Sequence, residues 1–201
     1  MRFLPELLAI AVAAILIVGP TSAEAQGQAF LVAQRAAPQP PGSAGLCGKY
    51  AWACARTGAS VSSEATALQL ARKINAKVNR GTRHMEDRAQ YGREEHWALP
   101  TARGGDCEDF VLLKKKMLVE AGVASEALLI ATVLDRDMSS HAVLVFRTRS
   151  GDLILDNLTN KILPWSKTGY TFLKLQNPAS LGKWDAVMAG GILVERPTAS
   201  N

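Results

Sequence analysis

Residues 104–110, with the sequence GGDCEDF, place a single cysteine among three carboxylates and directly ahead of an apolar, lysine-rich run. The run from about Asp106 to Ala121 has apolar residues at helical spacing and ends before a glycine, so it predicts a helix. Asp106 is a candidate N-cap of this helix, with Asp109 three residues on in the manner of a capping box. We therefore expect Cys107 to lie in the first turn of a helix.

Two opposite effects act on the thiol of Cys107 at this position. The helix dipole and the free N–H groups of a first turn lower the pKa of a thiol, and the same N–H groups can stabilise an oxyanion formed beside the sulfur. The carboxylates of Asp106, Glu108 and Asp109 raise that pKa, because nearby negative charge disfavours the thiolate. Either another group offsets this charge, or the carboxylates only satisfy the helix start and Cys107 is unreactive.

The predicted secondary structure differs before and after this helix. A helix is predicted upstream, with Ser62 and Ser63 as candidate N-caps and its end near Arg80. Downstream, short β-branched or alternating runs separated by turn residues predict strands at 128–135, 141–148, 153–157, 170–176 and 191–197. Helices followed by an antiparallel sheet define the α+β class.

A nucleophilic thiol also needs a base and a group that orients the base. His141 begins one predicted strand, and Asp156 lies near the end of the next. If Asp156 pairs opposite residue 141 or 143, the two side chains share a face and are within reach; opposite Val145 they are too far apart. The register is not fixed by the sequence, so the alternative is a histidine and an aspartate with no joint role.

Four motifs, in their order and spacing, resemble those of the bacterial transglutaminase-like cysteine proteinases, a group that includes the LapG-type periplasmic proteases. They are YGREEHW (91–97), GGDCEDF (104–110), HAVLVF (141–146) and GDLILDN (151–157). The resemblance implies a papain-like, transglutaminase-type α+β fold, with the nucleophile at a helix N-terminus packed on an antiparallel sheet. It also implies that Cys107 is the nucleophile, His141 the general base and Asp156 its orienting carboxylate, with Asn157 as a weaker neighbouring candidate.

The resemblance further implies a calcium ion. LapG-type members bind Ca²⁺ through the acidic residues that flank the nucleophile, and these match Asp106, Glu108 and Asp109. A bound cation would offset the negative charge around Cys107. On a regular helix Asp106 and Asp109 share a face while Glu108 points elsewhere, so a common site requires an irregular helix start. Helix capping is the alternative use of these carboxylates.

The first 25 residues have the pattern of a secretory signal peptide. Arg2 precedes an apolar run, Leu7 to Val18, and an A-x-A site ends at Ala25. As a helix the apolar run would rise only about 18 Å, too short for a membrane core of about 30 Å. We therefore expect cleavage after Ala25 and a periplasmic protein. Residues 26–45, rich in Ala, Gln, Pro and Gly, predict a flexible lead-in, and 46–201 the single folded domain.

Charge and cysteine content narrow the classes of function. The net charge of +5 is dispersed, and its one tight run, Lys114 to Lys116, is interpreted as a solvated helix face. No nucleic-acid motif accompanies it, so a nucleic-acid partner is not expected.

Of the three cysteines, Cys47 and Cys54 lie seven positions apart and predict a disulfide in an oxidising compartment, which leaves Cys107 free.

These observations favour an exported cysteine peptidase that hydrolyses a protein substrate, cell-surface or periplasmic, through a thioester acyl-enzyme. Two alternatives stay open: a transglutaminase-type acyl transferase, and a calcium-responsive binding module on a degenerate enzyme scaffold. Membrane association is expected only through an inner-membrane regulator of the kind that LapG-type proteases work with. The substrate and the oligomeric state are not determined by the sequence.

Overall fold

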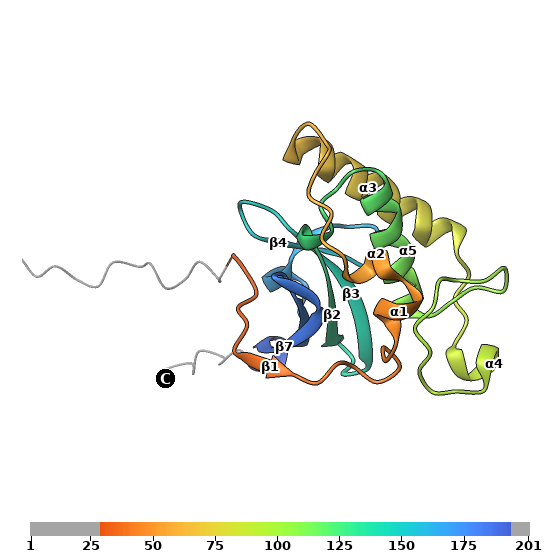
Figure 1. Ribbon diagram of the computed structural model, residues 1–201. Coiled ribbons are helices and arrows are strands. Elements are labelled where there is room, and N and C mark those ends of the chain that lie inside the picture. The colour runs from red at the N-terminus through yellow and green to blue at the C-terminus, as the bar shows by residue number, and fades with distance from the viewer. Residues whose placement is uncertain (1–28, 194–201) are drawn as a thin grey trace, which may run out of the picture.

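The computed structural model describes residues 29–193, which form an antiparallel sheet with helices packed against it (Figure 1). The strand order is β1-β7-β6-β2-β3-β4-β5. The strands are β1 (Arg35–Ala37), β2 (Leu128–Leu134), β3 (Ser140–Arg147), β4 (Asp152–Leu155), β5 (Leu163–Pro164), β6 (Thr171–Asn177) and β7 (Ser180–Gly190). The helices are α1 (Leu46–Lys49), α2 (Ala51–Cys54), α3 (Glu64–Gly81), α4 (Asp87–Tyr91) and α5 (Cys107–Glu120), with 3-10 turns η2 (Ser125–Ala127), η3 (Trp165–Lys167) and η4 (Gly191–Leu193). The mixture of helices and an antiparallel sheet confirms the predicted α+β arrangement.

Helix α3 begins at a serine cap, as the sequence predicts. The side-chain oxygen of Ser63 accepts a hydrogen bond from the N–H of Thr66 (3.1 Å), which satisfies one free amide of the helix start. Residues at three- and four-residue spacing form its buried stripe: Ala67, Ala71, Ile74, Asn75 and Val78. This stripe packs against α5, so the long helix supports the helix that carries Cys107.

Helix α5 lies between α3 and β3 and is buried on more than one side. Lys114 and Lys115 are both fully buried, and only Lys116 of the lysine run reaches solvent. The interpretation of this run as a solvated face is therefore wrong for two of its three residues. The reason is tertiary packing: Lys115 Nζ donates a hydrogen bond to Gln176 Oε1 (2.7 Å), and Lys114 Nζ lies 5.9 Å from the centre of the Phe110 ring.

Both faces of the central sheet are covered. Side chains on a strand alternate between faces. On β3, Leu144 packs with residues of α3 and α5 in one hydrophobic cluster, while its neighbour Val145 packs with Phe172 of β6 in a second cluster. A strand buried on both faces needs apolar residues at successive positions, which explains the unbroken apolar run of β3.

The described part of the predicted flexible lead-in, residues 29–45, is docked on the domain. Strand β1 pairs with β7, with Arg35 opposite Ala186. Upstream of β1, Leu31 is buried and its N–H donates to Asp152 Oδ2 (2.8 Å). The prediction of a flexible segment, based on its low apolar content, does not hold over these residues. Backbone pairing with β7 and the buried Leu31 hold the segment on the domain.

The C-terminal part of the sheet also differs from the sequence-based expectation. β7 was not predicted, and the strand expected at 191–197 does not form over 191–193, which adopt the 3-10 turn η4. Residues 194–197 lie outside the described residues. A tight turn joins β6 to β7, because Asn177 Oδ1 accepts the N–H groups of Ala179 (2.9 Å) and Ser180 (3.0 Å).

Short helices α1 and α2 are joined by the predicted disulfide, since Cys47 and Cys54 are bonded with their Cα atoms 5.4 Å apart. Cys107 is the free cysteine. The predicted signal peptide, 1–25, lies outside the described residues. Between residues 29 and 193, no helix has the length and apolar character needed to cross a membrane.

Candidate active site

Cys107 is the first residue of α5, and two glycines bring it there. Gly104 has φ +126°, and a Cβ on it would lie 2.2 Å from the carbonyl oxygen of Arg83. A Cβ on Gly105 would lie 2.6 Å from Cβ of Asp109. Neither position accommodates a side chain, so the two glycines allow the chain to pass close to the segment at Arg83 before the helix begins.

The predicted capping box is not formed at this helix start. Asp106 precedes α5 with extended backbone angles, but its side chain makes no cap hydrogen bond; instead Asp106 Oδ2 accepts the N–H of Asp87 (3.3 Å). Asp109 Oδ1 accepts the N–H of Ala98 (2.8 Å). Both carboxylates therefore hold neighbouring loops rather than the helix end.

His141 and Asp156 meet across the β3–β4 hairpin. Leu144 pairs with Leu155, so Asp156, one residue beyond β4, falls opposite residue 143, one of the two registers that bring the side chains within reach. His141 Nε2 lies 3.0 Å from Asp156 Oδ1, and both side chains are buried. An ionised carboxylate only accepts hydrogen bonds, so Nε2 carries the proton and Nδ1 is the nitrogen left for another partner.

Asp156 has further partners that sequence analysis did not find. Its Oδ1 also accepts the N–H of Leu158 (3.0 Å), and its Oδ2 accepts the hydroxyl of Tyr170 (2.6 Å). Its backbone carbonyl accepts Nδ2 of Asn79 from α3 (2.9 Å). Burial raises the pKa of Asp156, but the hydrogen bonds from His141 and Tyr170 outweigh it and hold that pKa below its ordinary value.

Cys107 and His141 line one cleft of about 270 Å³. Its other lining residues come from the N-terminal segment, the loop before α5, α5 itself and strands β2, β3 and β6: Pro40, Pro41, Glu95, Trp97, Glu108, Thr132, Val133, Ser140, Ala142, Leu173 and Lys174. Leu173 lies at a register shift of β6 against both neighbouring strands. The cleft thus crosses the sheet beside the start of α5, and most of its wall is apolar.

The environment of Cys107 opposes the thiolate. Its Sγ donates to Glu108 Oε2 (3.1 Å). Burial raises the pKa of Cys107 well above its ordinary value, and the negative charges of Glu108 and Asp106 raise it further, while a hydrogen bond from the Ala142 N–H lowers it. The structure therefore contains the conflict that the GGDCEDF motif predicts: the carboxylates beside Cys107 disfavour its thiolate.

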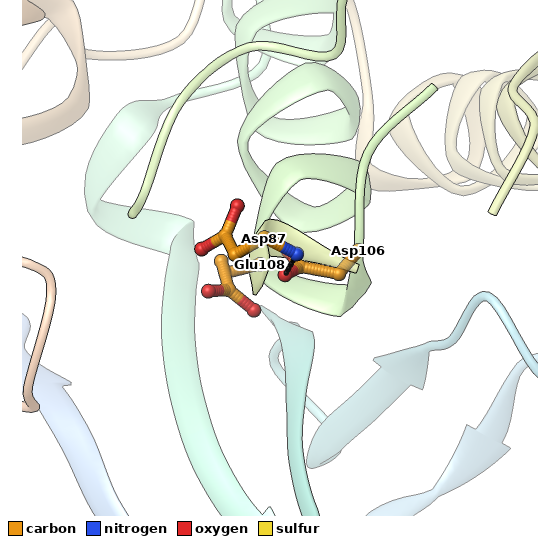
Figure 2. A group of neighbouring side chains, drawn as sticks. All are labelled: Asp87, Asp106 and Glu108. Atoms are coloured by element: carbon orange, nitrogen blue, oxygen red, sulfur yellow. Dashed lines mark hydrogen bonds between the residues drawn. The ribbon is translucent and has the colours of Figure 1, made fainter. Parts of the chain in front are cut away.

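Three buried carboxylates lie together at this point: Asp87, Asp106 and Glu108 (Figure 2). One oxygen of each lies within 4.8 Å of the others. Burial is the main cause that raises their pKa values, to about 6 for Asp106 and about 9 for Glu108. The irregular helix start allows the grouping, because Asp106 is extended rather than helical, and one of its carboxylate oxygens lies within 4.8 Å of one on Glu108.

The acidic cluster differs by one residue from the predicted ligands. Asp106 and Glu108 belong to it. Asp109 is outside this group: its Oδ1 accepts the Ala98 N–H, although its Oδ2 is also buried without a hydrogen-bond partner among residues 29–193. Asp87, which sequence analysis did not single out, takes the third place. It arrives there because Met85 N–H donates to the Gly105 carbonyl (3.0 Å), which holds the segment before α4 along the segment before α5.

The cluster has the chemistry of a site for a hard cation. One carboxylate oxygen of each member, Asp87 Oδ1, Asp106 Oδ1 and Glu108 Oε1, is buried without a hydrogen-bond partner among residues 29–193. Buried carboxylates usually have such partners, and oxygen-only ligand sets suit Ca²⁺ or Mg²⁺. The donors present therefore fit a bound cation.

Comparison with known proteins supports one family. The model of the bacterial transglutaminase-like cysteine proteinases matches residues 33–191. Among solved structures, calcium-bound LapG of Legionella pneumophila matches with 28% sequence identity and a TM-score of 0.52, over 62% of this chain and 71% of that one. EGTA-treated LapG of the same organism matches with 29% identity and a TM-score of 0.48, over 55% and 63%. No curated protein sequence matched. This chain belongs to the bacterial transglutaminase-like cysteine proteinases, and it is a cysteine peptidase of that type.

Proposed function

We propose that this chain is an exported peptidase that cleaves a protein substrate with Cys107 as nucleophile, His141 as general base and Asp156 as the residue that orients His141. One observation carries the proposal: His141, hydrogen-bonded to a buried carboxylate, lines the same cleft as the free thiol. A nucleophile beside an oriented base is the arrangement that covalent catalysis requires.

In the first half of the reaction, His141 takes the proton of the Cys107 thiol, and the sulfur attacks the carbonyl carbon of the scissile peptide bond. The negative charge that develops on the carbonyl oxygen is stabilised by N–H groups at the start of α5. When the tetrahedral intermediate collapses, the C–N bond breaks and His141 returns its proton to the leaving amine.

The second half of the reaction releases the acyl group. A thioester now joins the substrate carbonyl to Cys107. His141 takes a proton from water, and the resulting hydroxide attacks the thioester. The C–S bond then breaks to release a carboxylic acid and the Cys107 sulfur, to which His141 returns its proton. Asp156 stays ionised throughout and stabilises the positive charge that His141 carries in each half.

For the cation we propose Ca²⁺, held by Asp87, Asp106 and Glu108. The calcium-bound form in which LapG of Legionella pneumophila was solved supports this choice, together with the unpartnered buried oxygens of the cluster. A bound Ca²⁺ supplies positive charge that opposes the effect of Glu108 and Asp106 on the pKa of Cys107. Backbone carbonyls or water would complete its six to eight ligands.

The proposed compartment is the periplasm. The signal-peptide pattern of residues 1–25 supports export, and the disulfide between Cys47 and Cys54 is compatible with an oxidising compartment. The proposed substrate is a periplasmic or cell-surface protein.

The proposal is tested by the rate at which iodoacetamide alkylates Cys107 at pH 6 in calcium chloride, followed by mass spectrometry. The other two cysteines are bonded to each other, so the rate reports Cys107 alone. An ordinary thiol, with a pKa near 8.5, reacts very slowly at this pH. We expect fast alkylation by the wild-type protein and a large loss of rate in His141→Ala.

A slow, His141-independent rate in calcium chloride would overturn the proposed triad and favour a binding module. If the thiol is active, the products separate the two enzymatic alternatives. New peptide termini mark a peptidase, whereas ammonia release with incorporation of an amine marks an acyl transferase.

A further inference from the structure

Tyr170 lies directly before β6 and is 6% exposed. Its backbone is fixed by a short chain of hydrogen bonds: the Tyr170 N–H donates to Thr168 Oγ1 (3.2 Å), and that hydroxyl donates to the carbonyl of Trp165 (2.7 Å). The ring therefore enters the interior from a rigid turn rather than from a loose loop.

Tyr170 contacts both members of the histidine–aspartate pair. Its hydroxyl donates to Asp156 Oδ2 (2.6 Å), and its ring packs edge-to-face on the His141 ring, with centroids 5.8 Å apart and planes at 86°. The short distance and the charged acceptor make the hydroxyl bond one of the stronger kind. One side chain thus restrains the carboxylate and the imidazole together.

The hydroxyl bond decides how Asp156 can rotate. The carboxylate torsion of an aspartate is soft, so a carboxylate held at one oxygen alone can turn. Here Oδ1 receives His141 Nε2 and the Leu158 N–H, and Oδ2 receives Tyr170. With both oxygens engaged, the plane of the carboxylate is fixed, and with it the direction in which the His141 ring is held.

Tyr170 acts from behind the pair and not from the cleft. It lines a hollow together with Asp156, Arg136 and Lys161, while the cleft beside Cys107 is lined by other residues. Burial raises the pKa of the Tyr170 hydroxyl, and the bond to Asp156 raises it further, so the group remains a donor throughout the working range of a peptidase.

We propose that Tyr170 is a positioning residue of this active site, whose hydroxyl fixes the plane of Asp156 and whose ring fixes His141, so that Nδ1 of His141 faces the thiol of Cys107. This inference rests on the proposed function. Tyr170 touches neither substrate nor the reacting atoms, and its effect passes through Asp156 and His141.

The test compares Tyr170→Phe with the wild-type protein and with Tyr50→Phe. Tyr170→Phe keeps the ring and removes only the hydroxyl. Tyr50→Phe removes another hydroxyl that is hydrogen-bonded, to the Leu99 N–H (3.0 Å), away from the pair. We expect Tyr170→Phe to lower the iodoacetamide rate of Cys107 at pH 6 in calcium chloride roughly ten- to hundredfold, and Tyr50→Phe to leave it unchanged.

A second readout separates positioning from general loss of stability. In the wild-type protein we expect a downfield proton resonance from His141 Nε2–H bonded to Asp156, which His141→Ala removes. In Tyr170→Phe this resonance should broaden or disappear while thermal unfolding remains cooperative. If Tyr170→Phe does not fold, 3-fluorotyrosine at position 170 keeps the shape of the side chain and makes its hydroxyl a stronger hydrogen-bond donor. A changed alkylation rate of Cys107 in this protein supports the positioning role of Tyr170, and an unchanged rate overturns that role.

The outcomes distinguish the inference from the proposed function. A wild-type alkylation rate and an unchanged resonance in Tyr170→Phe, with a slow rate in His141→Ala, would overturn the role of Tyr170 and leave the triad standing. Slow, His141-independent alkylation of the wild-type protein would overturn both.

Discussion

Glu108 is the residue at which the proposed nucleophile and the proposed cation site meet. One of its carboxylate oxygens accepts the thiol of Cys107, and the other is buried without a hydrogen-bond partner within residues 29–193. The same side chain thus raises the pKa of Cys107 and offers a ligand to the cation that, in the proposal, would lower this pKa. A cation bound by Glu108 would lower the pKa of the Cys107 thiol from close by, because the two side chains are neighbours in sequence and hydrogen-bonded to each other.

The identity of the ligands can be tested one carboxylate at a time. Asp87→Asn removes a charged member of the acidic cluster and should weaken calcium binding roughly tenfold or more, measured by calorimetry and by the calcium-dependent rise in Tm. Asp109→Asn keeps an oxygen for the Ala98 N–H and lies beside the cluster, so its calcium affinity should stay near the wild-type value.

A clear loss of affinity in Asp109→Asn, with none in Asp87→Asn, would favour the ligand set predicted from sequence over the one the structure brings together. Potassium chloride at matched ionic strength, in place of calcium chloride, is the control for charge screening.

Among the elements, α5 carries two buried lysines, Lys114 and Lys115, beyond the end that holds Cys107. Burial lowers the pKa of Lys114 to about 7, and its Nζ has no hydrogen-bond partner in the described part of the chain. Such a group destabilises the fold when it is charged, because its ammonium loses water without gaining a counter-ion at hydrogen-bond distance.

Lys114→Met should therefore raise the free energy of unfolding at pH 7 by about 1–3 kcal/mol. The folded pKa lies below the unfolded value of about 10.4, so between these limits the unfolded state binds more protons and Lys114 makes stability rise with pH. The advantage of Lys114→Met over wild type should be largest at pH 7 and below, and shrink toward pH 10. Urea unfolding at several pH values measures it.

Lys116→Met is the matched control, because Lys116 lies on the same helix, partly exposed, beside Glu120. It should change stability little and show no such pH dependence. A Lys114→Met protein less stable than wild type at pH 7 would contradict the account of an uncompensated buried charge.

Elements with local signals were predictable, and those that depend on distant pairing were not. Helix α3 has its serine cap and apolar stripe in sequence, and the β3–β4 hairpin has its turn. Strand β1 has neither, since it exists through pairing with β7, far along the chain. Asp87 and Tyr170 could not be predicted for the same reason. Each reaches the site through a contact with another segment of the chain, Asp87 with Asp106 and Tyr170 with Asp156, and no local sequence pattern indicates these contacts.

At the scale of the whole molecule, Asp152 ties the N-terminal segment to the sheet. Its Oδ1 accepts Arg147 Nε (2.8 Å), and its Oδ2 accepts both Arg147 Nη2 (2.7 Å) and the Leu31 N–H. Asp152→Ala leaves these donors without their acceptor in a buried position, so we expect a loss of about 3–5 kcal/mol in the free energy of unfolding. Denaturant titration measures it, with the exposed Asp137→Ala as control.

A loss of only a few tenths of a kcal/mol in Asp152→Ala would mean that water replaces the carboxylate, and that β1 and the buried Leu31 are enough to hold the N-terminal segment.

The disulfide stabilises the molecule at a second place. Cys47 and Cys54 close a short loop, with a sequence separation of seven, and in the chain-entropy account this is worth about 2–3 kcal/mol. The double variant Cys47→Ser with Cys54→Ser should lower the free energy of unfolding by that amount and leave the alkylation rate of Cys107 unchanged. A large drop in that rate would instead show that α1 and α2 hold the cleft in shape.

The pairing of β1 with β7 also sets an order of assembly. Pairing of residues 35–37 with residues 184–186 closes a loop of nearly the whole described chain. Closing so long a loop is entropically costly, so this contact should form late in folding. The segment that contributes Pro40 and Pro41 to the cleft wall is therefore expected to dock after the central strands have formed. In pulsed hydrogen exchange during refolding, the amides of β2 and β3 should become protected first and those of β1 last, so that the cleft beside Cys107 acquires its final wall only when folding is complete.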